Sequence, residues 1–120
     1  MNAQELDRIT AQLASVYGEA TKVGQEGQRR LVQIEGVDLY PGCQPLQTTM
    51  LIVLDPGHPK PQVFVAPGQR LSNGRLPKNN SSILIAGRTW MQFSFNIPWS
   101  DGDNIMRFIA AARQRFTQNE

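Results

Sequence analysis

Residues 55–61 limit the possible folds of this chain more than any other segment, because three of the seven are proline. Proline has no amide hydrogen and a fixed φ, so this segment cannot be helix or central strand, and we expect a stiff extended connection. Residues 48–54 before it end in a continuous apolar run, which predicts a central strand covered on both faces. Residues 63–65 predict a short strand after it.

Apolar residues recur at helical spacing near both ends of the chain. Near the N-terminus they are Leu6, Ile9, Leu13, Val16, Tyr17 and Ala20, and near the C-terminus they are Ile105, Phe108, Ile109, Ala112 and Phe116. The first set predicts a helix from Asn2 to about Thr21. Ser100 and Asp103 form a Ser-x-x-Asp capping box, which predicts the start of the C-terminal helix.

The segments between the helices read as strands and turns. A polar connection containing Gly24 and Gly27 precedes a predicted strand over residues 31–39, and the apolar parity of that strand changes at Gly36, which predicts a β-bulge. After a long irregular loop over 67–80, residues 83–86 form a short apolar, hairpin-like segment. Alternation through Met91, Phe93 and Phe95 then predicts a half-exposed strand.

The composition is that of an ordinary globular protein, with 120 residues, 40% of them hydrophobic and 18% charged. We therefore expect one domain over residues 1–120. The longest apolar run, Met50 to Leu54, is far shorter than a membrane-spanning helix requires, so no membrane partner is expected. The N-terminus is polar and acidic, unlike a secretory signal, and this favours a cytoplasmic location.

Charge and metal-ligating residues give no sign of a nucleic-acid or metal partner. Residues 1–55 hold four Lys or Arg against seven Asp or Glu, whereas residues 56–120 hold eight against three. The basic residues are dispersed among turns, so nucleic-acid binding is not expected. Cys43 is the single cysteine and His58 the single histidine, which leaves no Cys/His set for zinc. We predict no metal and no cofactor.

Two motifs resemble those of ubiquitin-conjugating (UBC-fold) enzymes. Residues 55–65 (DPGHPKPQVFV) resemble the proline-bearing connection between the middle strands of that family, and residues 97–105 (IPWSDGDNI) resemble its Trp-Ser-Pro helix entry. The resemblance covers residues 30–116 and is nearest to the bacterial UBC-like proteins of ubiquitin-like conjugation systems, often associated with antiphage defence. It implies an α+β fold with an N-terminal helix, an antiparallel meander of about four strands, a long loop, and a C-terminal helix packed on the sheet.

The resemblance also implies a catalytic cysteine, which this chain lacks at the family position. Family members form a thioester between a cysteine thiolate and a ubiquitin-like C-terminus and then pass it to an amine. The corresponding stretch, residues 79–92, contains no cysteine, and its Asn79 and Asn80 stand without the usual His-Pro-Asn triplet. Either the loss is natural, or Ser81, Ser82 or Ala86 stands where a cysteine was replaced.

Each candidate site residue has a structural alternative. Cys43 is a candidate relocated nucleophile or a small buried thiol, and His58 is an acid, base or partner contact or a solvated turn residue. Trp90 and Trp99 are candidate partner-binding residues or core residues. Asp101 and Asp103 are a carboxylate pair or helix-start caps.

The sequence therefore favours a UBC-like protein that is non-catalytic and binds a ubiquitin-like protein, its activating enzyme, or both. Two alternatives remain: an interaction or scaffold domain in a secretion or phage-related assembly, and a hydrolase or transferase that uses Cys43.

Overall fold

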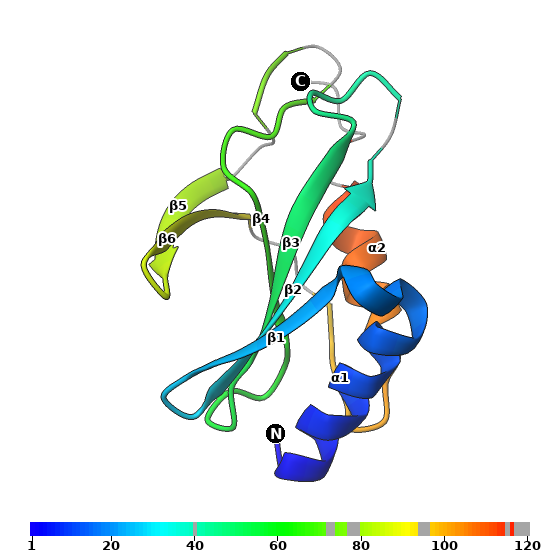
Figure 1. Ribbon diagram of the computed structural model, residues 1–120, viewed down its shortest axis with the longest axis vertical. Coiled ribbons are helices and arrows are strands. Elements are labelled where there is room, and N and C mark those ends of the chain that lie inside the picture. The colour runs from blue at the N-terminus through cyan, green and yellow to red at the C-terminus, as the bar shows by residue number, and fades with distance from the viewer. Residues whose placement is uncertain (40, 72–73, 77–79, 94–96, 115, 117–120) are drawn as a thin grey trace.

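The computed structural model describes residues 1–120 except 40, 72–73, 77–79, 94–96, 115 and 117–120 (Figure 1). Its elements are α1 (Ala3–Tyr17), the short 3-10 helix η1 (Gly18–Ala20), β1 (Thr21–Glu26), β2 (Arg29–Asp38), β3 (Gln47–Leu54), β4 (Gln62–Val65), β5 (Asn80–Ile85), β6 (Arg88–Phe93) and α2 (Met106–Gln114). The strands form one antiparallel sheet in the order β1-β2-β3-β4-β6-β5. The α+β class is confirmed, but the described residues form six strands rather than about four.

One face of the sheet packs against both helices. Side chains alternate between the two faces of a strand, so every second residue of β2, β3 and β4 faces α1 and α2. The buried cluster on this face includes Ile34, Ile52 and Val65 from the sheet, Ile9 from α1 and Phe108 from α2. Figure 1 shows the two helices on the same side of the sheet.

The opposite face has a smaller apolar cluster, which the β5–β6 hairpin covers. Its members are Leu31, Leu51, Val53, Phe64, Ile85 and Trp90. The first four alternate with the helix-facing residues of β2, β3 and β4, whereas the last two come from the hairpin. The last five residues of β3 are all buried, which confirms the prediction of a strand covered on both faces.

The structure corrects the predicted end of the first helix and the connection that follows it. The helix ends at Tyr17, where Gly18 takes a φ of 56°, and Thr21–Glu26 is an exposed edge strand rather than a polar connection. The predicted continuation to about Thr21 was wrong. Ala20 continues the apolar spacing of the sequence, but it lies in η1, which has no buried residue. Gly27 lies in the turn between β1 and β2, with a φ of 60°.

Two predictions about the middle of the chain hold and one is corrected. The register of β2 against β3 shifts between Ile34 and Val37, where Gly36 has a φ of 69°, which confirms the bulge. Residues 55–61 contain neither helix nor strand, as expected, but they fold into a turn with a 3.0 Å hydrogen bond from His58 N to Asp55 O rather than an extended connection. The strand predicted through Phe95 is confirmed up to Phe93, where β6 ends, and residue 95 lies outside the described residues.

The capping box was wrongly placed at the start of α2. Asp103 Oδ2 accepts from Ser100 N at 2.7 Å, and Asp103 N donates to Ser100 O at 3.0 Å, so the motif closes a turn ahead of the helix. The helix begins at Met106, whose N–H donates to Asn104 Oδ1 at 2.9 Å. Sequence alone could not separate the two cases, because the same side chains cap a turn and a helix.

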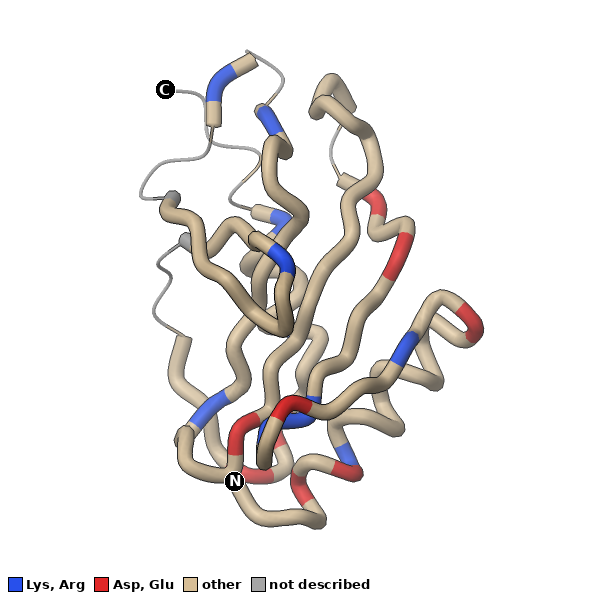
Figure 2. The backbone as a smooth tube through the Cα atoms, turned by 60° about the vertical axis from the view of Figure 1, so that its left-hand side comes forward, with Lys and Arg blue, Asp and Glu red and all other residues tan. Residues whose placement is uncertain are grey.

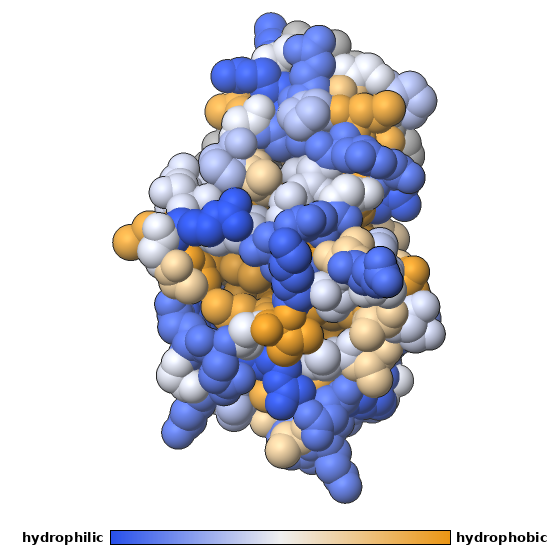
Figure 3. Space-filling model, in the orientation of Figure 1, coloured by the Kyte–Doolittle hydropathy of each residue, from blue (hydrophilic) through white to orange (hydrophobic). Residues whose placement is uncertain are grey.

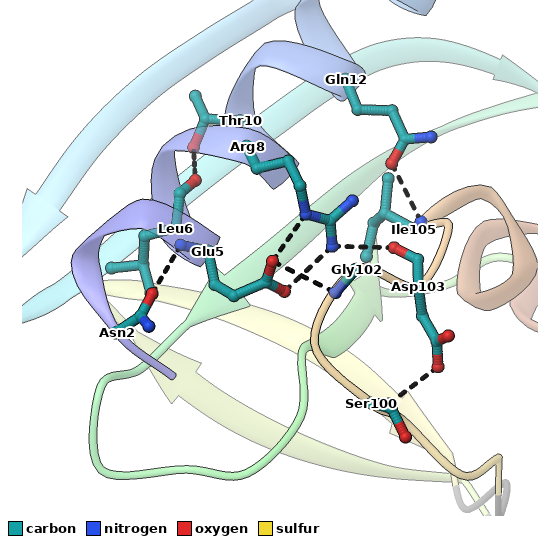
Figure 4. A network of polar contacts seen from close by, with 10 residues as sticks. All are labelled: Asn2, Glu5, Leu6, Arg8, Thr10, Gln12, Ser100, Gly102, Asp103 and Ile105. Carbon is teal, nitrogen blue, oxygen red and sulfur yellow. Dashed lines mark hydrogen bonds and ion pairs between the residues drawn. The ribbon is translucent and has the colours of Figure 1, made fainter.

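Side chains of α1 hold the loop that leads into α2 (Figure 4). Arg8 donates to both carboxylate oxygens of Glu5, at 2.6 and 2.9 Å, and to Asp103 O at 2.8 Å. Glu5 also accepts from Gly102 N at 3.2 Å, and Gln12 Oε1 accepts from Ile105 N at 3.1 Å. The buried Glu5 carboxylate is therefore satisfied by donors from its own helix and from the loop.

The hydrogen bond from Arg8 holds the pKa of Glu5 below its ordinary value of 4.5, although burial acts in the opposite direction and Gly102 N assists Arg8. A carboxyl with a lowered pKa in the folded state stabilises the fold above its unfolded pKa and loses that contribution as the pH falls through the folded value. The stabilisation is therefore complete at neutral pH and decreases as the pH falls below the ordinary value of 4.5 toward the lower folded value.

We predict that Glu5→Gln lowers the free energy of unfolding by about 1–3 kcal/mol at pH 7, because the charged acceptor of Arg8 and Gly102 is lost. Urea unfolding at pH 7 and pH 3 measures the effect, and the difference from wild type should shrink at pH 3.

The matched control is Asp7→Asn on the same helix, where the carboxylate is 71% exposed and pairs only with Arg30 in the described structure. It should cost no more than about 1 kcal/mol. An equal loss for both variants, or a Glu5→Gln effect that does not change with pH, would contradict the role assigned to Glu5.

Candidate functional site

A groove of about 200 Å³ opens on the face of the sheet opposite the helices. One wall is β1, the floor includes Leu31 of β2 and Leu51 of β3, and the other wall is the β5–β6 hairpin with Ile85 and Trp90. Figure 3 shows this region as an apolar hollow between the hairpin and β1, with hydrophilic residues around it. The groove exists because the hairpin covers only part of this face.

The hairpin turn is fixed to the other side of the groove. Ala86 and Gly87 have φ values of 50° and 81°, and two consecutive residues of positive φ between paired strands form a turn that matches strand twist. Ala86 N donates to Glu26 Oε2 at 2.7 Å, and Glu26 also forms an ion pair with Arg29. The contact joins the end of β1 to the hairpin, although a left-handed conformation is unfavourable for alanine.

Arg88 and Trp90 form the polar and aromatic part of the groove. The Arg88 guanidinium carbon lies 4.9 Å from the centre of the Trp90 ring, and Arg88 Nη1 donates to Gln33 Oε1 at 3.3 Å. Lys22, across the groove, pairs with Glu35 at 2.9 Å. Within the described part of the chain, Arg88 has no ion pair with a carboxylate. Its guanidinium can therefore form an ion pair with an acidic group of a ligand in the groove.

The single thiol is buried on the helix side. Cys43 is 5% exposed and belongs to the cluster that α1 and α2 cover. Its Sγ lies 3.6 Å from the carbonyl oxygen of Phe116 as a hydrogen-bond donor. In this position it behaves as a small core residue, and a macromolecular acyl donor cannot reach it without local opening.

The residues considered as replaced nucleophiles lie on the hairpin. Ser81 and Ser82 are exposed on β5, where Ser82 is paired with Met91 of β6, and Ala86 occupies the turn. The single histidine lies elsewhere, in the β3–β4 connection, so the structure does not place it beside either serine as a base.

The three predicted partner-binding residues lie in three different places. Trp90 is 2% exposed and forms part of the groove wall under Arg88. Trp99 is half-buried against the other core, with its ring edge-on to Phe108 at 5.3 Å and Arg8 at 5.9 Å from its centre. His58 is half-buried in the β3–β4 turn, where its carbonyl accepts from the Met1 amino group at 3.2 Å.

Of the groove residues, the sequence pointed to Trp90 as a partner-binding residue and to Ala86 as a replaced cysteine, but not to the others. The groove residues come from β1, β2, β3 and the hairpin, so no local motif joins them. One usable signal was Gly87, which separates the apolar residues 83–86 from the alternating residues that follow, because a glycine between two strand patterns is typical of a hairpin turn.

The described residues provide no group of three or more His, Cys, Asp or Glu arranged to hold a metal ion. None of the helices in the described ranges is both long and apolar enough to cross a bilayer. Lys and Arg are scattered along the described chain, as Figure 2 shows, which agrees with the dispersed pattern in the sequence.

Burial of Cys43 predicts slow reaction with an aromatic disulfide reagent in the native protein and rapid, complete reaction in guanidinium chloride. Ser82→Cys in a Cys43→Ala background is the matched control, because Ser82 is exposed and its thiol should react at once in native buffer. Absorbance of the released thiolate measures both rates. Native Cys43 that reacts as fast as the introduced thiol would contradict the buried assignment.

Comparisons with protein-family models, with curated proteins and with solved structures find no match to this chain. The UBC resemblance of residues 30–116 therefore remains a prediction from the sequence, and the function has to be argued from the geometry.

Proposed function

We propose that this chain is a non-catalytic, UBC-like binding protein of the cytoplasm. It acts in a bacterial ubiquitin-like conjugation pathway of the kind associated with antiphage defence, and it binds a ubiquitin-like protein or its activating enzyme. The observation that carries the non-catalytic part is the position of Cys43, the single thiol of the chain, inside the helix-covered core.

Thioester transfer requires a thiolate that a protein-sized donor can approach. Cys43 is buried and lies far in sequence from the stretch where the resemblance places the nucleophile, and the exposed groups on that stretch include the hydroxyls of Ser81 and Ser82. An unactivated hydroxyl is a poor nucleophile, and no histidine is paired with these serines in the described structure. These facts support binding without acyl transfer.

The order of elements supports the UBC-like part of the proposal. An N-terminal helix, the meander β1-β2-β3-β4 and a C-terminal helix on one face of the sheet are what the resemblance implies. The β5–β6 hairpin is an addition to that scheme, and it occupies the stretch that would bear the nucleophile. A binding role also agrees with the apolar groove beside this hairpin, since such hollows are common ligand and partner sites.

The test mixes the purified chain with a ubiquitin-like protein and an activating enzyme of a bacterial conjugation system, with ATP. We expect saturable binding in a pull-down, no thiol-sensitive adduct on a non-reducing gel, and identical behaviour of Cys43→Ala. A thiol-sensitive adduct that disappears with Cys43→Ala would overturn the non-catalytic role. Absence of both adduct and binding would reject the ubiquitin-like partner and favour the scaffold alternative.

Introduced thiols test the resemblance itself. Ser82→Cys, in the Cys43→Ala background, should form a thiol-sensitive adduct if β5 occupies the family's nucleophile position. Ser15→Cys on α1 is the matched control, since Ser15 is also an exposed serine. Equal adduct formation at both positions would indicate non-specific transfer and would contradict the UBC-like assignment of the hairpin.

A further inference from the structure

β1 is an edge strand with one free side. It pairs with β2 and ends the described sheet, and Val23 at its centre is 57% exposed. The two-residue turn after Glu26 makes Glu26 and Arg29 a hydrogen-bonded pair. Hydrogen-bonded and non-hydrogen-bonded pairs alternate along antiparallel strands, so Val23 and Gln25 belong to non-hydrogen-bonded pairs. The backbone N–H and C=O groups of Val23 and Gln25 are therefore directed away from β2, where another strand can pair with them.

The side-chain row of β1 that faces the groove has a gap. Lys22 is opposite Gln33 and Gly24 is opposite Leu31, so both β1 residues lie on the face that carries the groove. A Cβ added to Gly24 would meet no heavy atom within 4 Å. The free strand edge thus adjoins an open apolar surface over Leu31 and Leu51.

The charge of the groove indicates what would fill it. Lys22 is neutralised by Glu35, and Glu26 by Arg29. Arg88 remains without a carboxylate partner among the described residues, and its stacking on Trp90 holds the guanidinium at the groove. An occupant that combines an apolar side chain with a carboxylate would complement both features, because a charge-assisted bond to arginine is stronger than a neutral one.

We propose that the groove binds an extended peptide segment of a partner protein, which pairs with β1 as an added strand and presents an acidic and an apolar side chain two residues apart. The spacing follows from the pleat, because residues i and i+2 of a strand lie on one face. The apolar side chain lies over Gly24 and contacts Leu31, while the acidic one lies toward Lys22 and Arg88.

This inference rests on the proposed role of the chain as a binding protein, but not on the identity of its partner as ubiquitin-like. A selection from a phage-displayed library of linear random peptides tests it without any pathway protein. We expect enrichment of sequences with Asp or Glu two positions from an aliphatic or aromatic residue. If the pull-down with the ubiquitin-like protein failed, the peptide selection would still test the groove. If the selection failed, the pull-down would still test the ubiquitin-like partner.

Two variants test the groove with the best selected peptide, synthesised with both ends capped. Arg88→Gln should weaken its binding by about 10-fold or more through loss of the charged donor, and Gly24→Leu should abolish binding by filling the gap. The control is Arg70→Gln, which removes an exposed arginine that donates to Gly74 O at 3.0 Å outside the groove, and should bind as wild type. Thermal unfolding checks that each variant is folded.

Amide hydrogen exchange tests strand addition directly. Bound peptide should slow exchange at Val23 and Gln25, whose amides have no strand partner on that side among the described strands. A library that yields no acidic–apolar consensus, binding that neither variant weakens, or binding without protection of these two amides would overturn the proposal.

Discussion

The structure depends on one constraint, the burial of both faces of β3. Residues 50–54 are apolar without interruption, so each successive side chain has to be removed from water on alternate faces of the sheet. The helices satisfy this requirement on one face, where Met50, Ile52 and Leu54 join the larger cluster. Leu51 and Val53 require a second cover, which the β5–β6 hairpin supplies with Ile85 and Trp90.

The second cover is small, and this explains why the groove lies where it does. A two-stranded hairpin cannot shield the full width of the sheet, so Leu31 and Leu51 border an open hollow beside β1. The Ala86–Glu26 hydrogen bond fixes the hairpin turn to the end of β1, and the Arg88 guanidinium packs against the Trp90 ring beside the hollow. The same contacts that complete the fold therefore preserve an apolar surface with an open positive charge, a combination typical of a binding site.

Sequence predicted the parts of the fold that local pattern determines. The apolar run of β3, the parity change at Gly36 and the spacing of Leu6, Ile9 and Leu13 in α1 each follow from burial, and each was confirmed. The edge strand Thr21–Glu26 was missed because its residues are largely exposed and give no apolar alternation, and its pairing with β2 is decided by backbone hydrogen bonds. The start of α2 was misplaced because the Asp103 carboxylate accepts from Ser100 N within a turn, as it would at a helix start.

The candidate site was less predictable because its parts are brought together only by the sheet order. Lys22, Leu51 and Arg88 are distant in sequence, and the path from β4 to β5 and back to β6 is what places Arg88 beside β2. The sequence pointed instead to the absence of a cysteine at the family's nucleophile position. In the structure, the thiol of Cys43 lies under the helices, whereas the groove lies on the opposite face of the sheet. Recognition at the groove therefore needs no chemistry from Cys43, and a chain with this arrangement can keep a binding role without a nucleophile.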